Sequence, residues 1–330
     1  MGNLIRILIS LAFLGIFAYV SKDSIPEVLN AVRDANHLYL AIGVGSYILA
    51  CFAMGFRLKA ITKALSLRFS AFDSVCVTFI GYFFNNFLPT AVGGDIIKTY
   101  CLIRKTGDKT LSIASVLADR LYGLLMFLLI PSLAVVFMRN QLPDGIVYMV
   151  YCALAGGVVC VISIFFYGKI SQSRWVSGLK NRPGIFASLI RIYESVYRVA
   201  VHPVSAVKVC CFSIIGQLLS ISSVYWIIKS LMSVDGMGLP GYLLMAVPIV
   251  NLLSMIPSIN GLGVREVGYV YFLTKLMSQE LALTVALIFF SYLLVLSLIG
   301  AVIYMLRSDM HFDFSFLKRQ KTPESMGVKS

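Results

Sequence analysis

A polar interruption inside an apolar stretch constrains this chain more than any other feature. The segment from Tyr82 to Lys98 begins as an apolar helix and then carries two amides, a proline, two glycines and an acid. In a bilayer every backbone N–H and C=O must be bonded within the protein, so irregular backbone is tolerated only where protein buries it or a wet cavity adjoins it. The segment therefore predicts a cavity where the helix breaks.

A second stretch, from Asn251 to Glu266, repeats this pattern. Aligning its proline with the first one gives the pairs Pro89 and Pro257, Thr90 and Ser258, Gly93 and Gly261, Ile96 and Val264, and Lys98 and Glu266. Corresponding interrupted segments in two halves of a chain are typical of transporter binding sites. We therefore predict an internal repeat with an offset of 168 residues, the separation of Pro89 and Pro257.

Composition places these segments in a membrane protein. The 330 residues are 59% hydrophobic and 13% charged, against about 25% charged in soluble domains. The net charge of +13 comes from bases between apolar spans, which is typical of cytoplasmic loops and does not require nucleic acid. The seven cysteines and three histidines form no metal-ligating or disulfide pattern. We expect no cofactor and no metal.

The expected fold is an all-α polytopic membrane protein with six transmembrane helices and two opposed re-entrant helical hairpins. Spans need about 20 apolar residues each. The expected spans are 4–20, 37–57, 111–138, 146–167, 205–228 and 283–306. The first span has no convincing cleavage site after it, so we expect an uncleaved helix and not a signal peptide.

The distribution of bases orients the spans. Residues 57–70, 168–208 and 307–330 are basic and are expected in the cytoplasm, while 21–36, 139–145 and 229–241 are expected outside. The hairpin at 71–98 then enters from the cytoplasm and the one at 242–276 from the opposite face. An odd number of spans separates them, so residues 1–138 and 139–306 form inverted repeats, followed by a cytoplasmic basic tail. Both termini are expected in the cytoplasm. An amphipathic piece at 185–200 is expected either on an anionic leaflet or packed on the bundle.

The restarted helices after each break expose backbone N–H groups that favour anions. Gly93, Gly94 and Asp95 begin one return arm, and Gly261 and Gly263 begin the other. Thr90, Ser258 and Asn260 are expected to cap or donate hydrogen bonds there, with Pro89 and Pro257 as structural hinges. The alternative is that the glycines serve only close helix packing.

Two charges, Asp119 and Arg120, are expected about 12 Å deep in the span 111–138. Adjacent residues do not share a helix face, so each needs its own partner. We predict that Arg120 faces the central cavity and that Asp119 pairs with Lys98 or Arg265. The alternative is that both residues are structural pins between helices. Asn85 and Asn86 also need buried partners or water, and Glu266 opens the second return arm beside Arg265, where it is also an ordinary helix-dipole partner.

Three motifs carry a resemblance to a known family: Phe87 to Asp95, Ala118 to Gly123, and Pro257 to Glu266. The chain resembles the lysylphosphatidylglycerol synthase transmembrane-region family over nearly its whole length. The resemblance implies a lipid-handling protein of the bacterial inner membrane. The full synthase of this family also carries a soluble aminoacyl-transfer domain. Residues 307–330 leave no room for that domain, so we expect only the translocating part of the synthase here.

The expected function is translocation of an anionic or phosphate-bearing lipid between leaflets by a flippase-like protein without catalytic residues. Its expected partner is a membrane lipid with an anionic or polyprenyl-phosphate-linked head group. The second hypothesis is a non-catalytic partner that presents lipid to a separate glycosyl- or aminoacyl-transferase. A third is a lipid-modifying enzyme with Asp119 and Glu266, or Asp23 and Asp34, as its acids, which lacks any defined carboxylate spacing.

Overall fold

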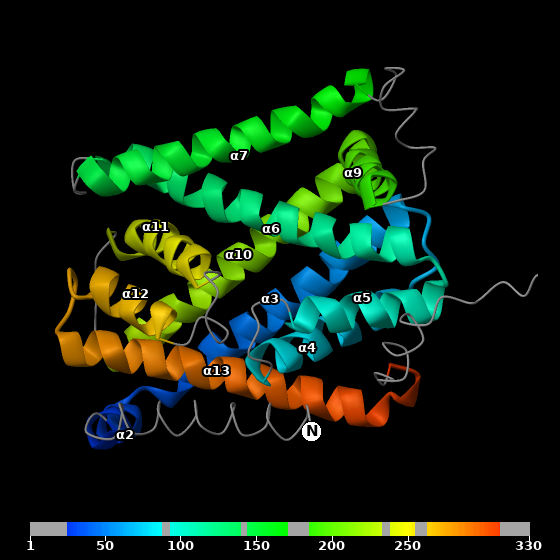
Figure 1. The fold of residues 1–330 in the computed structure, drawn as a ribbon. Coiled ribbons are helices and arrows are strands. Elements are labelled where there is room, and N and C mark those ends of the chain that lie inside the picture. The colour runs from blue at the N-terminus through cyan, green and yellow to red at the C-terminus, as the bar shows by residue number, and fades with distance from the viewer. Residues whose placement is uncertain are drawn as a thin grey trace, which may run out of the picture.

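The computed structural model describes residues 25–87, 93–139, 144–170, 185–232, 238–254 and 263–310. These residues form eleven α-helices and one short 3-10 helix (Figure 1). The helices are α2 (Ile25–Asp34), α3 (His37–Ala64), α4 (Ala71–Phe87), α5 (Gly93–Thr106), α6 (Lys109–Met138), α7 (Asp144–Ile170), α9 (Ile185–Val201), α10 (Pro203–Leu231), α11 (Gly238–Leu253), α12 (Val264–Leu273), α13 (Gln279–Leu306) and the 3-10 helix η2 (Ser308–Met310).

Four helices in the described part of the chain are long and apolar enough to cross a membrane. They are α3, α6, α10 and α13, which contain the predicted spans 37–57, 111–138, 205–228 and 283–306. The predicted span 146–167 lies within the helix α7. The predicted span 4–20 lies outside the described residues. The protein is thus a multi-pass membrane protein built from helices.

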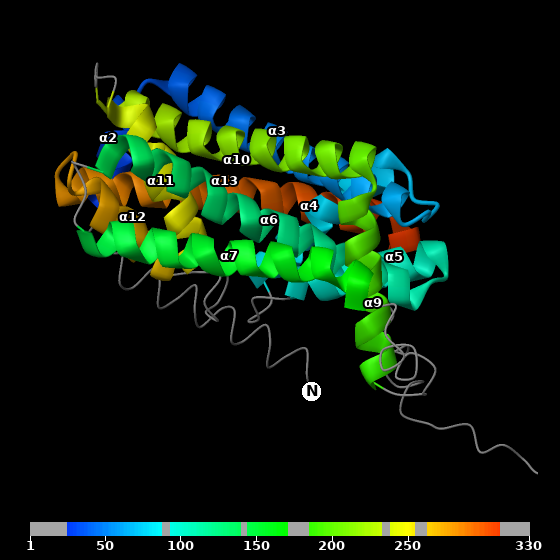
Figure 2. The same ribbon diagram turned by 90° about the horizontal axis from the view of Figure 1, so that it is seen from above.

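The two interrupted segments form two pairs of short helices. α4 packs against α5, and α11 packs against α12. Figures 1 and 2 place α5 and the start of α4 near the end of the bundle where α3 and α13 finish, and place α11 and α12 near the opposite end. The long helices lie between these ends, roughly along one axis. The breaks themselves, 88–92 and 255–262, lie outside the described residues.

The helices of the two halves correspond in order and in position. A shift of 168 residues moves α3, α4, α5 and α6 onto α10, α11, α12 and α13, within three residues at each end. Their packing partners correspond as well, because α4 packs on α13 while α11 packs on α6. α3 and α10 pack against each other along their length. This correspondence supports the predicted repeat.

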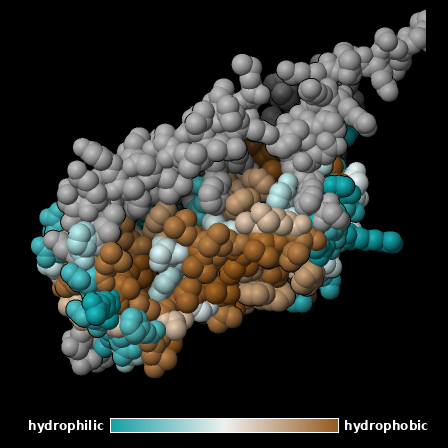
Figure 3. All heavy atoms as spheres, turned by 90° about the horizontal axis from the view of Figure 1, so that it is seen from below, coloured by the Kyte–Doolittle hydropathy of each residue, from teal (hydrophilic) through white to brown (hydrophobic). Residues whose placement is uncertain are grey.

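The coloured part of the face in Figure 3 has the distribution that a bilayer requires. On the face shown in Figure 3, hydrophobic residues occupy most of the middle of the molecule and hydrophilic residues gather toward its two ends. Large apolar side chains are exposed on the long helices, among them Leu133 on α6 and Leu298 and Val302 on α13. In water such exposure would be costly, whereas in lipid these side chains face a solvent as apolar as themselves.

Two segments differ from the sequence-based expectation. Arg57 was expected in a cytoplasmic loop, but α3 continues to Ala64 and leaves Arg57 buried within it. The predicted outer connection 21–36 contains the helix α2.

The amphipathic segment 185–200 is helical as predicted, and α9 crosses the long axis in Figure 2. Its residues Val196 and Val199 are buried in a cluster with α6 and α10, so it packs on the bundle.

A network of charges around the buried Asp73 joins α4, α5 and the end of α13. Asp73 accepts hydrogen bonds from Lys105 at 2.7 Å and from Arg307 at 2.6 Å. Asp309 contacts Arg307 at 2.9 Å and Lys105 at 3.2 Å. The hydrogen bond from Arg307 holds the pKa of Asp309 well below its usual value. The stabilisation from Asp309 is therefore present at neutral pH and is lost as the pH falls below about 4, toward that lowered pKa.

Candidate functional site

The first interrupted segment is held together by Asn85. Its Oδ1 accepts a hydrogen bond from the Gly94 N–H at 2.8 Å, so an amide at the end of α4 caps the start of α5. Gly93, Gly94 and Asp95 are all buried. Asn85 was predicted to need a buried partner, and the partner is one of the free N–H groups at the restarted helix. This contact fixes the distance between the two arms.

Gly94 permits a close approach that no other residue allows. A Cβ atom at this position would lie 2.2 Å from the Gly81 carbonyl oxygen and 2.7 Å from the Asn85 Oδ1 atom. The first neighbour is backbone and cannot rotate away. Close packing, one of the two roles predicted for these glycines, therefore applies to Gly94.

We expect Gly94→Ala to destabilise the folded protein by about 1 to 3 kcal/mol, the usual range for overpacking. The measurement is the free energy of unfolding in detergent. The matched control is Gly45→Ala in α3, where a Cβ atom would meet nothing within 4 Å. Equal stability of the two variants would contradict this interpretation.

Asp119 lies on α6 and is 5% exposed. Its Oδ1 atom accepts a hydrogen bond from the Arg57 Nε atom at 2.6 Å, and its Oδ2 atom lies 3.8 Å from the Lys98 Nζ atom. Of the two partners predicted for Asp119, Lys98 is correct. The prediction of Arg265 is wrong, because Arg265 contacts its neighbour Glu266 instead. Asp119 therefore joins α3, α5 and α6.

Arg120 points in another direction from α6 and has a partner of its own. Its Nε atom donates a hydrogen bond to the Asp95 Oδ2 atom at the start of α5. The Arg120 side chain keeps 34% of its surface exposed, whereas the Asp95 side chain keeps 9%. Asp119 and Arg120 therefore have separate partners, as the sequence predicted for this pair. Arg120 is thus held by a buried carboxylate, while part of its own side chain stays exposed.

Three more of the predicted residues, Asn86, Gly263 and Glu266, make structural contacts. Asn86 donates a hydrogen bond to the Leu293 carbonyl oxygen at 3.1 Å and another to Ser297, so it ties α4 to α13. Glu266 accepts a hydrogen bond from the Gly263 N–H at 2.7 Å and caps α12. Gly263 has a φ of +83°, a left-handed conformation that favours glycine. These three residues hold the arms in place.

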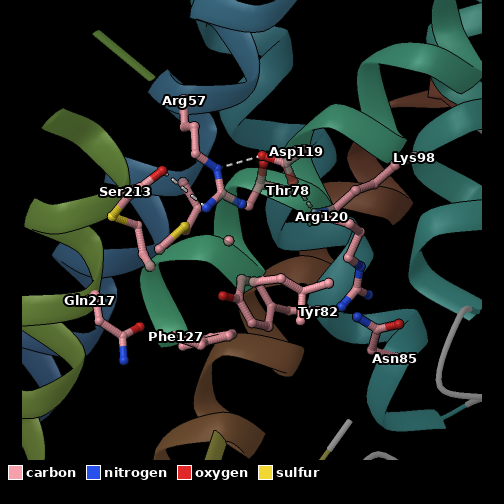
Figure 4. A pocket seen from close by; sticks show the side chains of 14 residues that line it. Arg57, Thr78, Tyr82, Asn85, Lys98, Asp119, Arg120, Phe127, Ser213 and Gln217 are labelled. Atoms are coloured by element: carbon pink, nitrogen blue, oxygen red, sulfur yellow. Dashed lines mark hydrogen bonds and ion pairs between the residues drawn. The ribbon is translucent and has the colours of Figure 1, made fainter. Parts of the chain in front are cut away.

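A polar cavity lies between the two halves and has two compartments. One compartment of about 140 Å³ is lined by Arg57, Lys98 and Asp119, and the other, of about 220 Å³, by Arg265, Asn251 and Ser254. Both compartments are lined by the same group of six side chains: Met54, Tyr82, Asn85, Arg120, Phe127 and Gln217. Figure 4 shows Arg57 directed at Asp119, with Arg120, Asn85 and Tyr82 nearby. Arg120 is the charged residue common to the two compartments.

The cavity carries an excess of positive charge. Its described lining holds four cations, Arg57, Lys98, Arg120 and Arg265, and one acid, Asp119. Counting the adjacent acids Asp95 and Glu266 still leaves one positive charge. Buried cations in excess of their partners favour an anionic ligand. The lining as a whole therefore suits an anionic group of small size.

A family model described as the lysylphosphatidylglycerol synthase TM region matches residues 3–300. The chain belongs to this family. The match includes both interrupted segments and every cavity residue named above, and it confirms the resemblance carried by the three motifs. A search of curated proteins finds no match.

Several cavity residues were not predicted from the sequence, among them Arg57 and Gln217. Arg57 was grouped with the loop bases, although a buried Asp119 in need of a cation was a signal for it. Gln217 on α10 is 2% exposed, and its Nε2 atom has no hydrogen-bond partner among the described residues. An amide within a span was its only signal. Six predicted residues, Pro89, Thr90, Pro257, Ser258, Asn260 and Gly261, lie outside the described residues.

Proposed function

We propose that this protein translocates an anionic or phosphate-bearing lipid between the leaflets of a bacterial inner membrane, with no chemical step. The observation that carries the proposal is the cationic cavity between the two halves, in which Arg120 adjoins both compartments. A head group that exchanges contacts between the two compartments keeps Arg120 as a partner throughout. Such a shared contact lowers the cost of moving a charge through the protein.

The proposed architecture has six spans, two re-entrant hairpins and inverted halves of residues 1–138 and 139–306. The corresponding helix bounds and packing partners of the two halves support it, and so does the location of the two short-helix pairs toward opposite ends of the bundle. In inverted-repeat transporters the site at the repeat interface is exposed to each side in turn. Both termini then lie in the cytoplasm.

The two halves of the chain have corresponding helices, but they contribute different charges to the cavity. The first half supplies Arg57, Lys98, Asp119 and Arg120, while the second supplies Arg265 as its only charge in the described lining. A head group therefore meets a different environment in each compartment. This asymmetry supports a ligand with one strongly anionic group that is held mainly by the first half.

The test is lipid exchange in reconstituted liposomes. We expect the purified protein to accelerate the exchange of fluorescent phosphatidylglycerol between leaflets relative to protein-free liposomes and to liposomes with heat-inactivated protein. Fluorescent phosphatidylcholine also carries a phosphate, but it should exchange more slowly than phosphatidylglycerol, because its choline cation offsets the phosphate charge and is repelled by the excess cations of the cavity. Exchange of both lipids at the protein-free rate would contradict the proposal.

A second outcome distinguishes the alternative function. A protein that only presents lipid to a separate transferase would bind phosphatidylglycerol but would not exchange it in isolation. Binding without exchange, together with co-purification of a glycosyl- or aminoacyl-transferase, would favour that role.

A further inference from the structure

A second, apolar pocket lies on the other side of α6 from the polar cavity. It has a volume of about 360 Å³, within the usual size range for ligand pockets of about 300 to 1,000 Å³. Its walls include leucines of α6, Gly157 and Val158 of α7, Ala200 of α9, and Cys210 of α10. Apart from the Tyr122 hydroxyl, the described lining offers no strong hydrogen-bonding group. An apolar pocket of this kind excludes water.

Met126 lies in the wall between this apolar pocket and the polar cavity. Its side chain lines both the apolar pocket and the compartment that holds Arg57 and Asp119. The two residues that flank Met126 on α6 face different sites. Leu125 lines the apolar pocket, and Phe127 lines the polar cavity. One helix thus presents a charged face to one site and an aliphatic face to the other, at the same depth.

We propose that the pocket between α6, α7, α9 and α10 binds one acyl chain of a membrane lipid. This inference rests on the proposed function, because the chain belongs to a lipid whose head group enters the polar cavity. A lipid whose polar head group lies on one side of α6 and whose acyl chain lies on the other side needs a polar site and an apolar site at the same time. The pocket and the cavity supply them, with Met126 at the boundary.

Gly157 gives the pocket its depth. A Cβ atom on Gly157 would lie 2.8 Å from the Leu128 Cδ1 atom, so a larger residue here would project into the pocket. At the neighbouring Gly156, a Cβ atom would meet nothing within 4 Å. Gly157→Leu therefore fills the pocket, and Gly156→Leu is its matched control on the same helix. Val158→Trp fills the pocket from a side chain that is 47% exposed, with Val159→Trp as its control.

The experiment is photolabelling in liposomes that contain phosphatidylglycerol with a diazirine near the end of one acyl chain. In the wild type we expect label on the peptides of α6 and α7 that line the pocket. Gly157→Leu and Val158→Trp should reduce this label about tenfold, since displacing about two methylene groups already has an effect of that size. Gly156→Leu and Val159→Trp should leave it unchanged.

Equal labelling in the filled variants and their controls would overturn the inference, because ordinary lipid around the protein labels all of them alike. Absence of label on these peptides in the wild type would also overturn it. Lipid exchange by the same variants separates this result from the proposed function. If the wild type exchanges lipid while all four variants label equally, only the acyl-chain site fails. If the wild type does not exchange lipid, the proposed function fails, whatever the labelling shows.

Discussion

Arg120→Ala is expected to reduce the exchange of phosphatidylglycerol in liposomes by roughly 10- to 100-fold. A hydrogen bond to a charged group contributes about 1.5 to 3 kcal/mol, and each 1.4 kcal/mol or so changes a rate or equilibrium constant about tenfold. Arg120 is the charged residue that lines both compartments, so its loss affects the head group at every stage of passage. Arg120→Lys should retain part of the activity, because an ammonium keeps the charge without the planar fork.

The matched control is Arg198→Ala on α9, where the arginine side chain is 60% exposed and pairs with Glu194. This variant should exchange lipid as the wild type does. Since Arg120→Ala leaves Asp95 buried without its partner, the double variant Asp95→Asn with Arg120→Gln provides a neutral pair of similar shape. Wild-type exchange by either well-folded Arg120 variant would show that Arg120 is a structural pin, the alternative that the sequence left open.

Asp119→Ala is expected to lower the free energy of unfolding by about 3 to 5 kcal/mol, the usual cost of removing one partner from a buried ion pair. Two cations depend on this carboxylate. The side chains of Arg57 and Lys98 are 8% and 11% exposed, so both would remain largely buried with one anionic partner fewer. The measurement is equilibrium unfolding in detergent, followed by far-UV circular dichroism.

The control for this prediction is Asp309→Ala, whose carboxylate is 45% exposed and should contribute less than about 1 kcal/mol. The triple variant Arg57→Met, Lys98→Met and Asp119→Leu should recover most of the stability lost in Asp119→Ala, since a buried ionic group replaced by apolar residues is often neutral. If Asp119→Ala were as mild as Asp309→Ala, the carboxylate would not be the junction of α3, α5 and α6.

The sequence predicted the elements of this protein with good accuracy, because lipid allows few solutions. Apolar runs of sufficient length must be helices, so α6, α7, α10 and α13 were found within four residues of their ends. α3 was found as well, but it continues seven residues beyond its predicted end, to Ala64. The aligned prolines at 89 and 257 gave the offset that relates the helices of the two halves. The same reasoning identified Asn85, Asp119 and Arg120 as residues that require buried partners.

Partner choice was decided only by the tertiary structure. The sequence states that Asp119 needs a cation, but which cation reaches it depends on how α3 packs beside α6. Arg57 is 62 positions from Asp119 in the chain and sits where a loop was expected. Gln217 enters the cavity because α10 packs along α3, which no local pattern encodes. Helix formation in a membrane is set by local hydrophobicity, whereas the contents of a cavity are set by contacts between segments distant in sequence.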